Sequence, residues 1–299
     1  MSGASPARVA LVGGGLIAVT YGLARFVFGL FLPQIRAELG LDPTLAGVIG
    51  ALPFMSYVGA IMAAPVVTRW LGVRVASAGV GLLALGGLLA VARADGPALL
   101  ALGVLVCGIS TGLSSPILAE GVQRLVRTDR RGRVNAAINA ATSVGIAVAA
   151  LAALWWTDAW RAAYVGFAAL AAIAVVGVLV VLPRVPRPSP RPQGTSLPAV
   201  HPRAWRDVVH LGGLAAAMGL VSAAYWVFAP DFLVNGGGLA PGRGGWIWLA
   251  VGLGGMAGTW AGDLIDRHGT GITHGFALAG LSGSLTLLAA DPGNLLLAL

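Results

Sequence analysis

Long apolar runs separated by short polar segments dominate the hydrophobic pattern of this chain. Each run has at least 18 residues, close to the roughly 20 apolar residues with which a helix crosses a hydrocarbon core. The runs are continuously apolar rather than alternating in ten-residue segments, which disfavours a membrane β-barrel. The pattern therefore predicts an all-α membrane protein with about nine transmembrane helices, over 9–33, 44–67, 75–92, 97–122, 134–156, 160–182, 207–232, 244–264 and 272–290.

Composition supports lipid as the environment of these runs. Of 299 residues, 57% are hydrophobic and 10% are charged, whereas a soluble domain has about 25% charged residues. The run from Val9 to Pro33 is too long for a signal peptide and lacks a cleavage site, so we interpret it as the first transmembrane helix. Cys107 is the only cysteine, which leaves neither a disulfide nor a thiolate metal site. We expect no cofactor.

The arginines predict the orientation of the chain. The net charge is +8, and the sequence contains no lysine. The arginines fall between apolar runs rather than on one soluble face, which argues against a nucleic-acid partner. Arg25 lies inside an apolar run. Of the other arginines, 14 lie in segments that the predicted helices place on the same side of the membrane as the N-terminus, and four lie in segments on the opposite side. Because positive charge favours the cytoplasmic side, we predict a cytoplasmic N-terminus.

A proline- and arginine-rich segment, 183–205, interrupts the series of helices. Such composition favours an extended, solvated linker. It divides the chain into a six-helix half, 1–182, and a shorter second half, 206–299. Residues 21–32 and 225–233 are similar, as are 68–74 and 262–269, at an offset of about 200 residues. The similarity predicts a parallel repeat about an axis along the membrane normal.

Two motifs carry a resemblance to a known family. The sequence G-D-L-I-D-R-H-G resembles the loop motif of the major facilitator superfamily, and the matching positions are Gly262, Leu264, Asp266, Arg267 and Gly269. The first-half copy keeps Arg69, Gly72 and Arg74 and has Thr68 where the family has Asp. The segment Y-G-L-A-R-F-V-F-G-L-F-L-P, 21–33, is similar to the first helix of a branch of poorly characterised bacterial permeases in that superfamily.

The resemblance implies a twelve-helix bundle that binds its substrate between two halves and opens alternately to either side of a bacterial inner membrane. It also implies that the loop residues bridge helix ends when the cytoplasmic side is closed. This chain departs from the family in its fourth and fifth runs, which lack the usual marks of proton antiport. After Asp291 it has only P-G-N-L-L-L-A-L, so we expect a C-terminal truncation and an incomplete second half.

Arg25 is the strongest candidate for substrate binding. A charge inside hydrocarbon is costly and usually faces a bundle interior, water or a partner. Tyr21 precedes it by one helical turn, and together they offer donors to an anionic group such as a carboxylate. Asn139, on one polar face of the fifth run with Asn135 and Ser143, is a further candidate. Two alternatives stay open: Arg25 pairs with a carboxylate or with helix-end carbonyls, and the polar face only joins neighbouring helices.

Asp231 and Glu120 are candidates for gating or coupling. The repeat places Asp231 at the depth of Phe31, and we expect it within reach of Arg25. The alternative is an interfacial aspartate where its helix ends. Glu120 precedes Arg124 by four residues, a favourable helical pair. The alternative to a proton site at Glu120 is a salt bridge with Arg124 at the surface or at an inner gate. The loop residues Arg69, Gly72, Arg74, Asp266, Arg267 and Gly269 complete the gating set by resemblance.

These features predict a secondary permease for a small organic solute, with an anion as the partner of Arg25. An enzyme is disfavoured, because the chain lacks H-E-x-x-H, G-x-S-x-G and a His or carboxylate cluster within the spans. The alternative is a truncated, non-transporting fragment or membrane scaffold. Loss of three helices would expose a surface that normally packs against protein, which predicts self-association.

Overall fold

In the computed structural model, the described residues are 5–156, 158–184, 202–240, 243–258, 264, 267–291 and 293. Their regular structure is helical throughout. The elements are α1 (Pro6–Ile17), η1 (Ala18–Arg25), α2 (Val27–Leu39), α3 (Pro43–Leu71), α4 (Val73–Ala92), α5 (Pro97–Leu125), η2 (Thr128–Arg130), α6 (Arg131–Trp155), α7 (Trp160–Val181), α8 (Pro202–Asn235), α9 (Gly244–Ala257) and α11 (Thr270–Ala290).

The predicted transmembrane helices are confirmed as an all-helical bundle. Within the described part of the chain, eight helices are long and apolar enough to cross a membrane. The run predicted over 244–264 begins as the shorter helix α9, and 259–263 lie outside the described residues. The predicted linker 183–205 falls mostly on 185–201, which also lie outside them, and α8 begins at Pro202.

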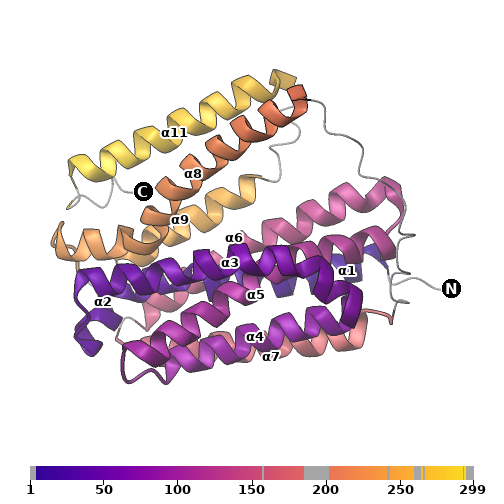
Figure 1. The fold of residues 1–299 in the computed structure, drawn as a ribbon. Helices are drawn as coiled ribbons and strands as arrows, with labels where there is room; N and C mark the ends of the chain where they lie inside the picture. The colour runs from indigo at the N-terminus through magenta and orange to yellow at the C-terminus, as the bar shows by residue number, and fades with distance from the viewer. Residues whose placement is uncertain are drawn as a thin grey trace.

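The elements α1, η1 and α2 form one span, and successive spans run in opposite directions, so the bundle has two distinct ends (Figure 1). We call the end with Pro6, Leu71 and Leu125 the basic end, because Arg69, Arg74 and the arginines around η2 lie there. The opposite end, with Leu39, Ala92 and Trp155, we call the Arg36 end. The two names define a direction along the bundle.

Small residues let the helices of the first half pack closely. A Cβ added to Gly87 of α4 would lie 2.7 Å from the sulfur of Cys107 on α5, and one added to Gly103 would lie 2.9 Å from the Gly87 carbonyl oxygen. Such close approach of backbones is how membrane helices gain contact when both surfaces are apolar. Cys107 is 1% exposed, so its side chain is part of this packing.

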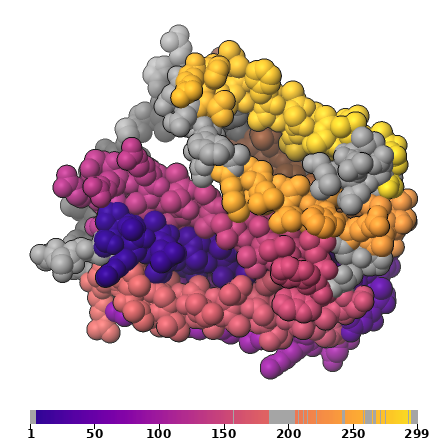
Figure 2. Space-filling model, turned by 180° about the vertical axis from the view of Figure 1, so that it is seen from behind, coloured from indigo at the N-terminus to yellow at the C-terminus, as the bar shows by residue number. Residues whose placement is uncertain are grey.

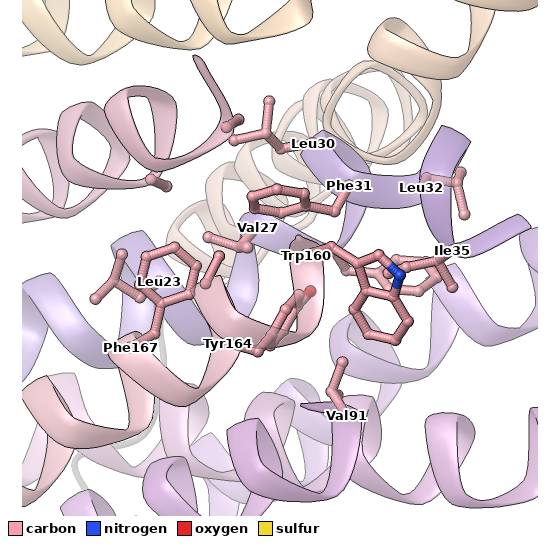
Figure 3. Close-up of a cluster of buried hydrophobic side chains, with 14 of the residues drawn as sticks. Leu23, Val27, Leu30, Phe31, Leu32, Ile35, Val91, Trp160, Tyr164 and Phe167 are labelled. Atoms are coloured by element: carbon pink, nitrogen blue, oxygen red, sulfur yellow. The ribbon is translucent and has the colours of Figure 1, made fainter. Parts of the chain in front are cut away.

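The first half has an aromatic core near the Arg36 end. Phe31 of α2 lies 6.0 Å from Tyr164 and 6.5 Å from Phe167 of α7, measured between ring centroids (Figure 3). Trp160 packs edge-on against Tyr164, and its indole N–H donates to Glu38 Oε2 at 2.6 Å. These contacts fix α2 against α7, while Phe26 and Gly29 contact Trp226 of the second half.

Among the described residues, the second half packs against the first from the middle of the bundle toward the Arg36 end. α8 packs against α2, and α9 packs against α6. In α8, Val227, Ala229, Pro230, Asp231 and Leu233 are buried, whereas 215–220 are all exposed. Figures 1 and 2 show α8 and α11 standing away from the first half at the basic end. The two halves therefore enclose a cleft that opens at the basic end.

Candidate functional site

The site is built on a π-helix in the first span. We predict one regular helix for this span, but η1 has the wider π geometry over Ala18–Arg25 and ends at Phe26. Such segments are uncommon and often occur at functional sites. The π-helix of this chain brings a charged residue, Arg25, to its last position.

Contacts with α5 and α6 hold this π-helix in place. A Cβ on Gly22 would lie 2.5 Å from the Cα of Gly145, so the backbones of η1 and α6 touch where both residues are glycine. The Thr111 hydroxyl of α5 donates to the Thr20 carbonyl at 2.7 Å, and the Thr20 hydroxyl donates to Ser114 Oγ at 3.1 Å. The position of Arg25 is thus fixed by its neighbours rather than by its own ion pair.

The guanidinium of Arg25 lies among four aromatic rings. Its Cζ is 4.5 Å from the ring centroid of Tyr57, 5.0 Å from Phe54, 5.1 Å from Phe26 and 5.7 Å from Tyr21. Cation–π attraction at these distances stabilises the charge. Nε is buried without a hydrogen-bond partner, and among the described residues no ion pair includes Arg25. The alternative in which Arg25 pairs with a carboxylate is therefore not found among the described residues.

Two tyrosine hydroxyls lie beside this cation. The Tyr21 and Tyr57 hydroxyl oxygens are 3.3 Å apart, and their rings meet edge to face. The structure thus brings Tyr21 and Arg25 together, as expected, and adds Tyr57 and Phe54 from α3. Sequence reasoning missed these two, because nothing in a continuously apolar run shows which of its aromatic residues meet a distant charge.

The second half contributes further rings next to Arg25. The Trp226 centroid is 4.2 Å from that of Phe26 and 5.3 Å from that of Trp248. Tyr225 and Trp248 stack with an interplanar angle of 13°. The contact between Phe26 and Trp226 therefore joins the two halves one residue beyond Arg25.

Asp231 pairs with Arg36 and not with Arg25. The two side chains form a salt bridge across the seam between α2 and α8, and Asn235 donates to Asp231 Oδ1 at 2.9 Å. The expectation that Asp231 lies within reach of Arg25 is wrong. Arg36, which holds Asp231, follows Arg25 by 11 residues, or roughly 16 Å along a helix, and its long side chain reaches Asp231 from the helix end.

Asn139 lies apart from Arg25. It is exposed on α6, and its amide donates to the Asn135 carbonyl of the same helix at 2.8 Å. One turn farther, Ser143 contacts α9 at Gly255, and Ala147 contacts it at Gly252. Because residues four apart share a helix face, Asn139 lies on the face of α6 that contacts α9 one turn farther along, and is itself exposed.

Glu120 forms the predicted pair within α5. Arg124 Nε donates to Glu120 Oε1 at 2.7 Å. A pocket of about 220 Å³ lies beside it, lined by Pro65, Thr68, Arg69, Pro116 and Glu120. This places Arg69 and Glu120, both from the gating set, at one pocket of the basic end.

One glycine of the loop motif has the same backbone conformation in both halves. Gly72 has φ 76° and ψ 159°, and Gly269 has φ 82° and ψ 155°, each just before a helix. These angles favour glycine. Arg74 donates to the Leu179 carbonyl of α7, and Arg267 is exposed. Asp266 lies outside the described residues.

Comparisons with known proteins agree with this architecture. The family model described as Major Facilitator Superfamily matches residues 14–299. Two solved transporters share the fold. A D-xylose–proton symporter matches with a TM-score of 0.69 at 14% identity, over 97% of this chain and 77% of its own. The nucleoside transporter NupG matches with a TM-score of 0.62 at 14% identity, over 87% and 69%. No curated protein sequence matches the chain.

The family match covers nearly the whole chain, and the chain therefore belongs to the major facilitator superfamily. It is a multi-pass membrane protein with the fold of a transporter. At 14% identity, the solved neighbours establish the fold and leave the substrate to be argued from the site.

Proposed function

We propose that this protein moves a small organic anion across a bacterial inner membrane by alternating access, with Arg25 and Tyr21 as its substrate-binding residues. The observation that carries the proposal is the Arg25 guanidinium, held among four aromatic rings without a carboxylate partner among the described residues. A buried cation without a counter-ion is costly. A bound anion would supply that counter-ion.

The charge distribution supports an orientation for this cycle. The predicted helices place 14 arginines on the same side of the membrane as the N-terminus, which is the side of the basic end. Positive charge favours the cytoplasmic side. With the N-terminus cytoplasmic, the cleft opens inward and the Arg36–Asp231 pair closes the outer side. Asn139 would then line the path from Arg25 to the cytoplasm, and Asp231 would act as an outer gate.

Uptake by proteoliposomes tests the proposal. Purified protein is assayed with radiolabelled butyrate as the anionic probe, and with D-xylose and uridine as neutral probes. We expect uptake of butyrate alone, and a fall of about tenfold to hundredfold in Arg25→Gln, because a hydrogen bond to a charged group contributes roughly 1.5–3 kcal/mol.

Arg93→Gln is the matched control, since Arg93 is exposed at a helix end and should leave uptake unchanged. Uptake of D-xylose or uridine that does not depend on Arg25, with no uptake of butyrate, would contradict the proposal. So would butyrate uptake of parental rate in Arg25→Gln.

A further inference from the structure

Among the described residues, Arg25 is the single charge at the middle of the bundle. It lies near the middle of the span Pro6–Leu39. The other arginines and the acidic residues that the structure describes lie near helix ends or between helices. A second charge on a bound solute would therefore find no partner of opposite sign at this depth. Because an unpaired charge away from water is costly, the site favours a solute with one negative charge.

Two hydroxyl groups add donors beside this cation. The Tyr21 and Tyr57 hydroxyl oxygens are 3.3 Å apart, so one of them donates to the other. Each hydroxyl has one proton to donate, and the pair therefore keeps one O–H for a ligand. A carboxylate that accepts this O–H polarises the whole chain of hydrogen bonds. Tyr57 thus brings α3 into the donor set of Arg25 and Tyr21.

This donor set is open to a ligand. Arg25, Tyr21 and Tyr57 are each only partly buried. The guanidinium has donors and no acceptor, and a carboxylate has acceptors and no donor. The site is therefore complementary to an ionised carboxylate and poorly matched to a polyol, whose hydroxyl protons need acceptors.

The remaining neighbours of Arg25 are apolar rings. The Phe54 and Phe26 centroids lie 5.0 Å and 5.1 Å from Arg25 Cζ. Such rings can contact the carbon chain of a solute but offer no carboxylate to an ammonium group. Arg25 would also repel an ammonium group at close range. An amino acid is therefore a poorer ligand than an acid with an uncharged chain.

We infer that the substrate is a monocarboxylate with an apolar chain and no second charge, and that Tyr57 donates to its carboxylate together with Arg25 and Tyr21. The inference rests on the proposed function, and it names the substrate class and one further binding residue of the same site. It separates this substrate from dicarboxylates, which need a second cation, and from amino acids, which need an anionic partner for their ammonium group.

Equilibrium binding to the protein in lipid nanodiscs tests the single-charge class. The probe is radiolabelled butyrate. The competitors are unlabelled butyrate, succinate and 4-aminobutyrate, which share a four-carbon chain and differ in the group at its far end. We expect succinate and 4-aminobutyrate to compete about tenfold more weakly than butyrate, or weaker still, because their second charge stays unpaired. Monomethyl succinate, which has the size of succinate and one charge, should compete better than succinate.

Tyr57→Phe tests the further binding residue. The change removes the hydroxyl and keeps the ring beside Arg25. We expect butyrate to bind about tenfold to hundredfold more weakly, because a hydrogen bond to a charged group is lost. Tyr164→Phe is the matched control. The Tyr164 hydroxyl is buried without a hydrogen-bond partner among the described residues, and its ring packs against Phe31 and Trp160. The thermal unfolding midpoint of each variant checks that the fold is kept.

The outcomes distinguish this inference from the proposed function. If succinate or 4-aminobutyrate competes as strongly as butyrate, the single-charge class is wrong while Arg25-dependent anion binding stands. If a folded Tyr57→Phe variant binds butyrate as the parent does, Tyr57 is not a binding residue. If butyrate does not bind, or if Arg25→Gln binds it as the parent does, both the inference and the proposed function fail.

Discussion

The two ends of the seam between the halves differ in what holds them. At the Arg36 end, close backbone contacts and an ion pair cross the seam: Gly29 meets the Trp226 carbonyl, and Arg36 meets Asp231. At the basic end, the ion pair of Glu120 and Arg124 lies within one helix, and 215–220 of α8 are exposed. Charged pairs at both ends thus have different consequences, because only a pair that spans the seam can keep the halves together.

The difference also explains where a substrate would bind. Arg25 immediately precedes Phe26, whose ring contacts Trp226 across the closed part of the seam. Closing the basic end and opening the Arg36 end would expose the same guanidinium to the other side. Changes at the two ends should therefore have unequal effects, and three of them test this.

Gly29→Ala should have the largest effect. A Cβ at this position would overlap the Trp226 carbonyl oxygen, and a backbone atom cannot move aside as a flexible side chain can. We expect the Arg36 end to remain open and butyrate uptake to fall to background. Gly59→Ala is the matched control, because a Cβ there meets nothing within 4 Å. Parental uptake in Gly29→Ala would show that this contact is not needed for the cycle.

Asp231→Asn should have an intermediate effect. It removes the partner of Arg36 at a site where the two side chains are 19% and 12% exposed. Losing a hydrogen bond between charged groups costs roughly 1.5–3 kcal/mol, which shifts the closed-to-open ratio about tenfold to hundredfold. With a cysteine introduced at the buried position of Val227, we expect a membrane-impermeant maleimide to react about tenfold to hundredfold faster in Asp231→Asn than in the protein with Asp231.

The reporter for Asp231→Asn needs little engineering, because the only native cysteine, Cys107, is buried. The double variant Arg36→Asp with Asp231→Arg should return labelling toward the parental rate. If it labels as fast as Asp231→Asn, the salt bridge does not hold the seam.

Glu120→Gln should have the smallest effect. Its carboxylate is 39% exposed, and its partner Arg124 lies on the same helix. Surface pairs of this kind contribute about 0–1 kcal/mol. We expect no change in Val227→Cys labelling and at most a small change in the thermal unfolding midpoint. A labelling change as large as that of Asp231→Asn would mean that the basic end also controls the seam.

Much of the candidate site followed from local sequence. Tyr21 and Arg25 are four residues apart, and the structure keeps them together despite the π-helix. The Glu120–Arg124 pair needed only helical spacing. The π-helix itself was missed, because it depends on the contact of Gly22 with Gly145 and on hydroxyls from α5, all distant in sequence. The predicted partner of Asp231 was wrong for a similar reason. An internal repeat predicts the depth of a residue in the membrane, but it does not show which side chain is long enough to reach that residue.

The sequence by itself determined that this chain is a helical membrane protein, because apolar runs of that length with so few charges are stable only in lipid. It also predicts the orientation of the helices in the membrane, through the uneven distribution of arginine. Only the tertiary structure decided which residues surround Arg25 and which end of the seam is closed. The reason is physical: helix formation and insertion depend on residues near in sequence, whereas ring contacts and a salt bridge depend on how close two helices from different halves can approach.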